Sequence, residues 1–385
     1  MVTTHHEELI RLRREFHRYP ELGFAEFRTQ SIVMEYLGEL GLDPKPIGGT
    51  GVVATLSGCE GGRTVMLRAD MDGLPVTERT GLPYASCNEG LMHACGHDGH
   101  MAMLLIAAKI LVSRKEQFSG NMKFVFQPNE ENAGASILIE QGVMADPHVD
   151  GVFGLHLWSA LPSGTIDIID GPQMAGAYDF SLEIVGAGGH AGFAHKAIDP
   201  IVAASAVIQA VQSIQTRELN AQDPAVIMFT QVVAGSSQNI IPESATLRGT
   251  IRFLYEGGEH ILEAFRRTAE HVCAAYRTEC KLSIILGNSL LSNDPRMASM
   301  MRDEAAIVLG REGTVSRHIR TMAGEDFSEY LRFAPGAFAF LGVNNPDAGS
   351  VYPHHHPKFT IDEKMLPVGT ELLVRSALRF LAPGA

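Results

Sequence analysis

Three apolar runs follow one another within residues 101–157: MAMLLIAAKILV (101–112), MKFVF (122–126) and VDGVFGLHL (149–157). The first is almost wholly apolar and has the length of a helix, which predicts a buried helix. The other two are short, which predicts buried strands, and a further helix is expected around 135–141 between them. Strands that alternate with helices in this way indicate an α/β sheet.

The segment before these runs extends the same pattern. Apolar spacing predicts a helix over 25–40, and two strands are expected over 51–56 and 64–68, joined by a turn at Gly61-Gly62.

The middle of the chain follows a different pattern. Residues 178–185 alternate between apolar and polar side chains, which predicts a strand with one face in water. We expect an inserted domain over 177–287 and a surrounding domain formed by 1–176 and 288–385. The elements expected after the first strand complete the order βαββαβ, the split unit of ferredoxin-like domains: a helix over 199–216, strands over 225–233 and 245–253, a helix over 258–276 and a strand over 281–286.

Length and composition agree with two globular domains. The 385 residues exceed the usual size of one hydrophobic core, and 45% of them are hydrophobic. Forty-four acidic residues against 31 basic ones give a net charge of −13, so nucleic acid and anionic membranes are not expected partners. No apolar run has the length of a membrane span, and the N-terminal segment lacks the apolar core of a signal peptide, which predicts a cytoplasmic protein.

The segment HACGHDGH (93–100) is the first candidate for metal chemistry. The five cysteines are an odd number in a long chain, which favours free or metal-bound thiols over a disulfide framework. Cys95 and His97 are separated by one glycine, so both side chains can converge on one zinc-like ion. The alternative is a polar, glycine-rich loop.

A pair of carboxylates follows the strand over 122–126. In open α/β sheets, functional groups gather beyond the carboxyl ends of strands, and Glu130 and Glu131 lie at such a place. One of them can bind a metal while the other faces a water molecule as a general base. The alternative is a solvated acidic turn.

Other candidates follow strands in the same way. His156 ends the run that begins at residue 149, although a lone histidine there is more often a core or loop residue. Asp70 and Asp72 follow the strand over 64–68, and they are interpreted as carboxylates that orient ligand histidines, or else as turn or cap residues. One histidine of the run 354–356 would complete five ligands, a number that suits two metal ions sharing a water.

Polar residues of the inserted domain give weaker signals. His190 lies in a glycine-rich turn that lacks the dinucleotide-binding order, Asn239 lies in a polar loop, and Arg252 carries a planar group suited to a carboxylate. Each of them also has a structural interpretation. Glu325 and Asp326 either cap a helix over 327–331 or contact substrate or a metal ligand.

Together these residues resemble the metal-dependent amidohydrolase family of aminoacylases, hippurate hydrolases, auxin-conjugate hydrolases and carboxypeptidase-G-type peptidases. The resemblance covers nearly the whole chain, and the form CGHD points to the hippurate-hydrolase and auxin-conjugate branch. The matching stretches keep the order and spacing of the family: RADMDGLP (68–75), HACGHDGHMAMLL (93–105), FQPNEENAGA (126–135), GLHLW (154–158), GGHAG (188–192), SSQNIIPESATLRGTIR (236–252), GEDF (324–327) and HHHPKF (354–359).

The resemblance implies a two-domain α/β fold, with a zinc-exopeptidase-like catalytic domain and the inserted ferredoxin-like domain as a lid and dimerisation domain. It implies hydrolysis of N-acyl amino acids, such as hippurate or N-acetyl amino acids, by a homodimer with two divalent ions per subunit. The donor types admit zinc, manganese, cobalt or nickel. The ligands of the family map onto Cys95, His97, Glu131, His156 and His355.

The same resemblance assigns the remaining roles. Glu130 maps onto the general base, and the lid residues that bind the carboxylate and the oxyanion of the substrate map onto His190, Asn239 and Arg252. In the family, some lid residues reach the site from the partner subunit. His355 is preferred over His354 because the family ligand lies two residues before the proline.

The sequence departs from the family at one position and leaves several alternatives open. Ala194 precedes His195 where the family often has a proline. An N-acetyl-diaminopimelate deacetylase or a small-peptide metallopeptidase would use the same motifs. A non-catalytic metal- or amino-acid-binding protein is disfavoured because both Glu130 and Glu131 are present, and a redox or metal-storage role leaves the inserted domain unexplained.

Overall fold

The computed structural model describes residues 2–313 and 318–382. The chain divides into two compact units: unit 1 comprises Met1–Gly171, Ser292–Ile319 and Glu325–Ala385, and unit 2 comprises Pro172–Leu291 and Arg320–Gly324. Among the described residues, no helix combines the length and the apolar character needed to cross a bilayer. The boundaries expected from the sequence for the inserted domain, 177–287, stay a prediction.

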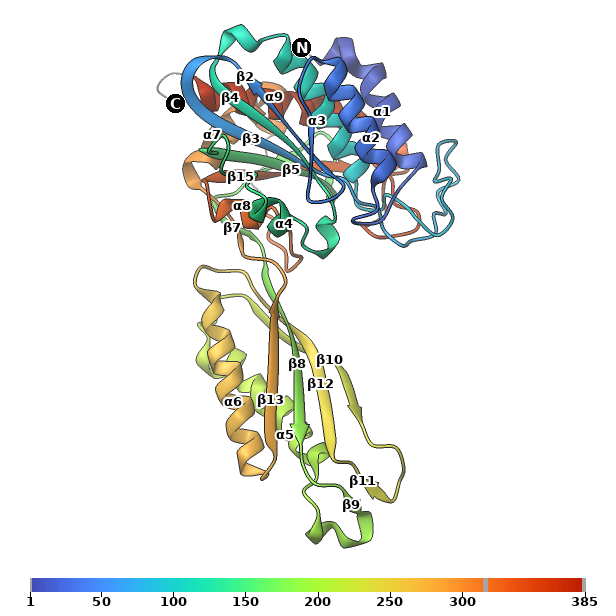
Figure 1. Ribbon diagram of the computed structural model, residues 1–385, viewed down its shortest axis with the longest axis vertical. Coiled ribbons are helices and arrows are strands. Elements are labelled where there is room, and N and C mark those ends of the chain that lie inside the picture. Colours follow the sequence, from blue (N-terminus) through green and yellow to red (C-terminus); the bar gives the residue numbers. More distant parts are fainter. Residues whose placement is uncertain (1, 314–317, 383–385) are drawn as a thin grey trace. The chain divides into compact units, whose positions relative to one another are not determined.

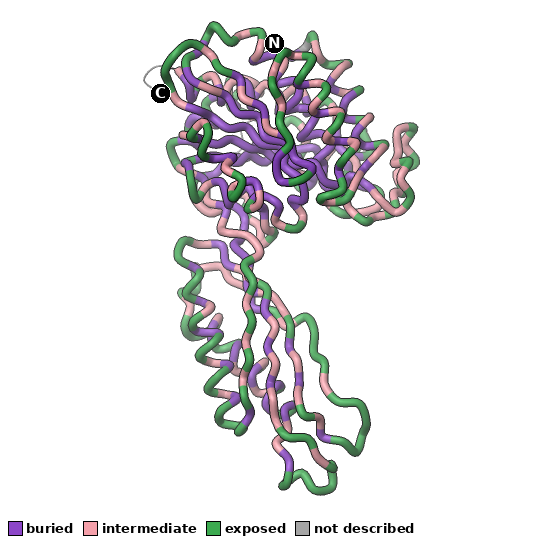
Figure 2. The backbone as a smooth tube through the Cα atoms, in the orientation of Figure 1, coloured by how far each residue is buried: buried purple, intermediate pink, exposed green. Residues whose placement is uncertain are grey.

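Unit 1 is built on a seven-stranded mixed sheet (Figure 1). Its four central strands run parallel to one another, and the three outer strands are antiparallel to their neighbours. Figure 2 shows that the central strands are buried along most of their length. In spatial order the strands are β1 (Lys45–Ile47), β2 (Gly51–Ser57), β4 (Ser119–Gln127), β3 (Cys59–Asp70), β5 (Gly151–Pro162), β15 (Gly336–Asn344) and β6 (Ile166–Asp167).

Helices cover this sheet. The predicted buried helix is confirmed as α3 (His97–Val112), whose residues from Met101 to Ala108 are all buried. It packs beside α9 (Leu366–Leu381), and both helices contact β3. The other helices of unit 1 are α1 (His6–Arg18), α2 (Phe27–Glu39), α4 (Ala135–Glu140), α7 (Pro295–Gly313) and α8 (Ser328–Leu331).

The predicted turn at Gly61-Gly62 is wrong. Strand β3 runs through both glycines, whose φ angles are +75° and +94°, and its register with β4 shifts between Cys59 and Thr64. Glycine adopts such positive φ angles without the steric cost of a Cβ atom, so the pair produces an irregularity inside the strand.

Unit 2 has the predicted βαββαβ order. Its four strands form an antiparallel sheet in the spatial order β10-β12-β8-β13, and α5 and α6 pack against its buried face. Leu182 of the central strand pairs with Leu247 on one side and Leu282 on the other. The two-domain α/β fold class is therefore confirmed. The elements are β8 (Gly176–Val185), α5 (Pro200–Ser213), β10 (Ala225–Ala234), β12 (Ser244–Phe253), α6 (Ile261–Ala275) and β13 (Glu279–Leu286).

Candidate metal centre

Cys95 and His97 flank the first residue of a sharp turn into α3. Gly96 between them has a φ of +100°, which only glycine adopts readily, so the turn brings both side chains to one side. The Nδ1 atom of His97 lies 2.9 Å from the backbone oxygen of Asp72. A carbonyl oxygen only accepts hydrogen bonds, so Nδ1 is the donor and Nε2 is the atom that points to the cluster.

His156 lies inside a strand rather than at a strand end. β5 continues to Pro162, but its pairing with β3 stops at Phe153, so His156 lies beyond the end of that ladder. Its Nδ1 donates to the backbone oxygen of Leu157 at 2.8 Å, and its Nε2 lies 3.4 Å from Sγ of Cys95. The side chain therefore presents Nε2 to the thiol.

Glu131 and His355 approach the cluster from two loops. Oε1 of Glu131 lies 3.2 Å from Nε2 of His355. In contrast, both ring nitrogens of His354 are engaged, one with the hydroxyl of Ser159 at 3.1 Å and one with the backbone oxygen of Leu157 at 2.8 Å. Of the two histidines, His355 is the one with a nitrogen turned towards Glu131.

The donor atoms form two groups that share one residue. Cys95 lies with His97 and His156 in one group and with Glu131 and His355 in the other, and within each group all donor atoms are within 4.8 Å of one another. Thiolate, imidazole and carboxylate suit zinc and other first-row transition metals. One buried atom, Nε2 of His97, has no hydrogen-bond partner among the described residues. These residues would fit a pair of divalent ions, with Cys95 common to both donor groups.

In the metal-free cluster, two of the histidines have raised pKa values. Burial lowers the pKa of His97, but the charges of Asp70 and Cys95 and the hydrogen bond with Asp72 together outweigh it, and the net pKa lies well above the usual range. Hydrogen bonds to Cys95 and Glu131 raise the pKa of His355 to about 10. Ligand histidines must be neutral, so metal binding would release protons from this site.

Glu130 lies beside the donor groups and is 8% exposed. Its Oε2 is 4.0 Å from Nε2 of His97. Burial raises the pKa of Glu130 well above its usual range, and the nearby carboxylates of Glu325 and Asp326 raise it further. A bound cation would oppose this shift, because the positive charge favours the ionised form.

The two aspartates have different neighbours. Asp72 contacts His97 through its backbone oxygen and, at 3.2 Å, through Oδ1, as expected for a residue that orients a ligand. Asp70 instead accepts from Nδ1 of His100 at 2.6 Å and from Arg68 at 2.7 Å, and its closest approach to His97 is 3.8 Å.

Arg68 is a buried residue beside the candidate site that the sequence did not single out. It is buried, and it binds the carboxylates of Asp70, Glu325 and Asp326 at 2.7, 3.1 and 2.8 Å. Glu325 also accepts from the backbone N–H of Phe327, at the start of the helical turn that had been expected there. The only sequence signal was the place of Arg68 in the same motif as Asp70, directly before the strand end.

The three lid candidates lie in unit 2 but are not all together. His190 and Asn239 line one open pocket of about 620 Å³. Nδ1 of His190 accepts from the backbone N–H of Gly192 at 3.0 Å. Arg252 lies at the end of β12, where it donates to the backbone oxygen of Met322 at 2.7 Å.

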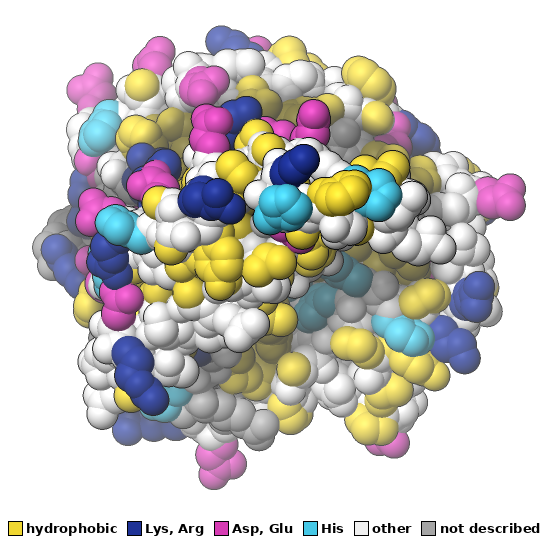
Figure 3. Space-filling view, turned by 90° about the horizontal axis from the view of Figure 1, so that it is seen from below, with side chains coloured by type: hydrophobic (Ala, Val, Ile, Leu, Met, Phe, Trp, Pro, Cys, Tyr) yellow, Lys and Arg dark blue, Asp and Glu magenta, His cyan; other side chains and the backbone are white. Residues whose placement is uncertain are grey.

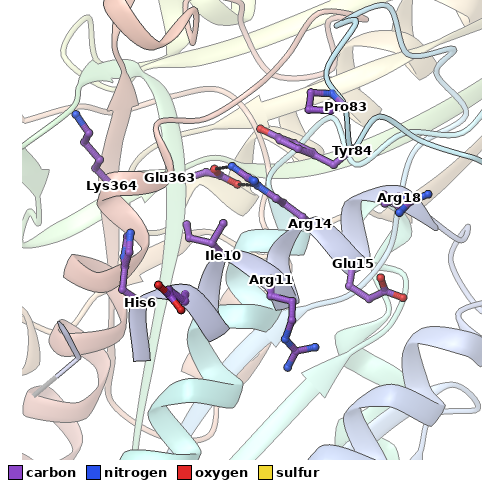
Figure 4. Close-up of a pocket in the computed structure, with 11 residues that line it drawn as sticks. His6, Ile10, Arg11, Arg14, Glu15, Arg18, Pro83, Tyr84, Glu363 and Lys364 are labelled. Carbon is purple, nitrogen blue, oxygen red and sulfur yellow. Dashed lines mark hydrogen bonds and ion pairs between the residues drawn. The ribbon is translucent and has the colours of Figure 1, made fainter. Parts of the chain in front are cut away.

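A larger pocket, of about 720 Å³, lies along α1 (Figure 4). It is lined by Ile10, Tyr84 and several charged side chains, and Arg14 forms an ion pair with Glu363 at its edge. None of the predicted site residues lines it, so its size does not mark it as the site of the metal chemistry.

Comparisons with known proteins agree with this geometry. The family model described as "Peptidase family M20/M25/M40" matches residues 66–379. Thermostable carboxypeptidase 1 of Saccharolobus solfataricus is 38% identical, over 97% of this chain and 95% of the relative. N-acetyl-L-cysteine deacetylase of Bacillus subtilis is also 38% identical, over 99% and 90%.

A solved structure gives the same result. It is that of a Bacillus subtilis protein described as a dinuclear metal binding peptidase from the M20 family, with a TM-score of 0.85 and 34% identity over 98% of this chain and 99% of that one. The resemblance to metal-dependent amidohydrolases and their peptidase relatives is confirmed. The chain belongs to peptidase family M20/M25/M40.

Proposed function

We propose that the protein is a two-metal-dependent amidohydrolase that cleaves the amide bond of N-acyl amino acids to a carboxylic acid and a free amino acid. This proposal rests on one observation: Cys95 belongs to two groups of possible metal ligands, and Glu130 lies beside them. The names of the relatives support it, because one is a deacetylase of an N-acetyl amino acid and another is a carboxypeptidase, and both activities hydrolyse amide bonds.

The roles of the residues follow from their chemistry. Cys95, His97, Glu131, His156 and His355 hold the metals, and Asp72 orients His97. When bound, the two ions polarise the amide carbonyl and acidify the attacking water. Glu130 accepts the proton of that water and passes it to the nitrogen of the leaving amine. The water oxygen bonds to the amide carbon as the C–N bond breaks, which gives the two products.

The inserted domain supplies substrate recognition in this proposal. Residues 177–287 act as a lid, in which His190, Asn239 and Arg252 bind the carboxylate and the developing oxyanion of the substrate. Histidine and asparagine are suited to donate hydrogen bonds to an oxyanion, and the planar group of arginine suits a carboxylate. The shared pocket of His190 and Asn239 supports this role for those two residues.

The test is amide hydrolysis by the purified protein loaded with zinc, manganese, cobalt or nickel in turn. The substrates are hippurate, N-acetyl-methionine, N-acetyl-cysteine, indoleacetyl-alanine, N-acetyl-diaminopimelate and a dipeptide. Metal-dependent release of an amino acid from an N-acyl substrate is the expected result. A preference for the dipeptide would instead identify a small-peptide metallopeptidase, the second candidate that a carboxypeptidase relative favours. Two bound metals without turnover on any substrate would contradict the proposal.

The choice between His355 and His354 has a direct test. We expect His355→Ala to weaken metal binding at least tenfold, because one of the two donor groups loses a ligand. His354→Ala is the matched control, since its nitrogens are bonded to Leu157 and Ser159. Metal content after dialysis against graded chelator concentrations measures both. Equal losses, or a larger loss from His354→Ala, would exclude the assignment.

We also propose a homodimer that forms through the lid domain. Figure 3 shows hydrophobic side chains gathered in patches on the surface. Met228, Val232 and Val233 of the edge strand β10 are 53%, 58% and 54% exposed. Exposed apolar side chains on an edge strand favour pairing with another chain.

A charged substitution on β10 tests the dimer. Val232→Asp should shift the mass measured by light scattering after size-exclusion chromatography from dimer towards monomer. Ile307→Asp on α7, a site that is 59% exposed, is the control and should leave the dimer intact. A monomeric wild-type protein would refute the proposal.

A further inference from the structure

Three consecutive backbone N–H groups of the loop that carries Glu130 and Glu131 donate to buried carboxylates. The N–H of Glu130 donates to Oδ1 of Asp72 at 3.0 Å, and that of Glu131 donates to Oδ2 at 3.2 Å. The N–H of Asn129, one residue earlier, donates to Oε1 of Glu26 at 3.0 Å. The backbone that aims both glutamates is therefore held by two side chains from distant parts of unit 1.

The side chain of Glu26 makes this contact inside the protein. It is fully buried at the start of α2, and its second oxygen accepts from the hydroxyl of Thr50. A buried carboxylate is costly unless its oxygens are hydrogen-bonded, and both oxygens of Glu26 are. It belongs to neither group of metal donors.

The chain turns sharply at Asn129, and the contacts of this residue hold the turn in place. Its φ of +56° and ψ of +43° lie in the left-handed region, which asparagine adopts more readily than most other residues that carry a side chain. The side chain of Asn129 also packs closely against Gly23, where an added Cβ atom would collide with its Oδ1. The same segment therefore leaves room for the side chain of Asn129 at Gly23 and accepts a hydrogen bond from its backbone at Glu26.

We propose that Glu26 is a positioning residue of the active site: through the N–H of Asn129 it fixes the loop that aims Glu130 at the reacting water. The part of this inference that concerns turnover rests on the proposed function. The structural part does not, because it concerns the order of the loop itself. A displacement of about 1 Å at a catalytic group is enough to lower turnover by about 10²-fold.

The test compares Glu26→Ala with Glu26→Gln. We expect Glu26→Ala to lower kcat by about 10–100-fold with a smaller change in KM, while two metal ions per subunit remain bound. Glu26→Gln should stay within about threefold of the wild-type protein, because its amide oxygen still accepts from Asn129 and its NH₂ group accommodates Thr50. Hydrogen–deuterium exchange of a peptide covering residues 128–134 should be faster in Glu26→Ala than in the other two proteins.

Two further variants keep the test decisive. Glu304→Ala removes another buried glutamate, which binds Arg375 on the far helices of unit 1, and it should leave kcat and the exchange of 128–134 unchanged. If Glu26→Ala does not fold, Thr50→Val frees one oxygen of Glu26 and should produce a smaller effect of the same kind.

The outcomes separate this inference from the proposed function. If the wild-type protein cleaves no amide, the proposed function fails, but faster exchange of 128–134 in Glu26→Ala still supports the positioning role. Unchanged exchange of 128–134 in Glu26→Ala would overturn the positioning role. A loss of kcat in Glu26→Gln and Glu304→Ala that equals the loss in Glu26→Ala would also overturn it.

Discussion

Glu130→Gln should lower kcat by about 10²–10⁴-fold and leave the metal content unchanged. General acid–base catalysis contributes a factor of this size, and glutamine keeps the shape of the side chain but cannot take up a proton. Glu130 is suited to the role because it lies beside the donor groups without being needed to complete either one of those that share Cys95. Single-turnover kinetics and elemental analysis of the same preparation measure both quantities.

Glu131→Gln is the matched control for this prediction. Both substitutions remove one charge from adjacent positions, but Glu131 faces His355 and Cys95, so its loss should deplete the metal. Activity that survives in Glu130→Gln, or metal loss that is equal in the two variants, would contradict the division of roles.

The fold could be predicted from local patterns in the sequence. The length and uniform apolar character of residues 101–112 identified α3, and period-two alternation with regular spacing identified the βαββαβ unit. The failure at Gly61-Gly62 has a local cause. Two glycines usually mark a turn, but here they form an irregularity in β3, because β4 pairs with this strand on both sides of them. Pairing between strands is a tertiary effect that the local sequence does not contain.

Candidate residues of the site could be predicted because they follow strands whose carboxyl ends meet. This reasoning works for Glu130 and Glu131, and it reaches His156 although that residue lies within β5. It fails for residues whose importance depends on distant partners. Arg68 binds Glu325 and Asp326, which lie far along the chain, and Glu26 binds the backbone of Asn129. Neither pairing produces a periodic pattern in the sequence.

Arg68 also explains how several carboxylates remain buried close together. Its guanidinium binds three of them and also donates from Nε to Gln127 at 2.9 Å. Even so, burial raises the pKa of Asp326 to about 8, although the charge of Arg68 opposes the shift. Arg68 therefore does not neutralise every carboxylate that it binds, and this deficit of positive charge reaches Glu130 through Glu325 and Asp326, whose charges raise its pKa.

Arg68→Met should consequently destabilise the metal-free protein by about 3–5 kcal/mol, the usual cost of removing one partner from a buried ion pair. Methionine retains most of the volume, so the loss reports the charge rather than a cavity. Denaturant unfolding followed by circular dichroism measures the change. Arg375→Met is the control: the side chains of Arg375 and Glu371 are each 24% exposed, so this ion pair is partly hydrated, and the loss there should be below about 1 kcal/mol.

The pH dependence of this loss distinguishes charge from packing. Without Arg68, the pKa of Asp326 in the folded protein rises further above its unfolded value, so the folded variant binds more protons than the folded wild-type protein. Stability then falls with increasing pH more steeply in the variant, and the difference between the two proteins should be larger at pH 8 than at pH 5. A difference that does not change with pH would mean that Arg68 acts through packing, and the deficit of positive charge near Glu130 would then have no energetic consequence.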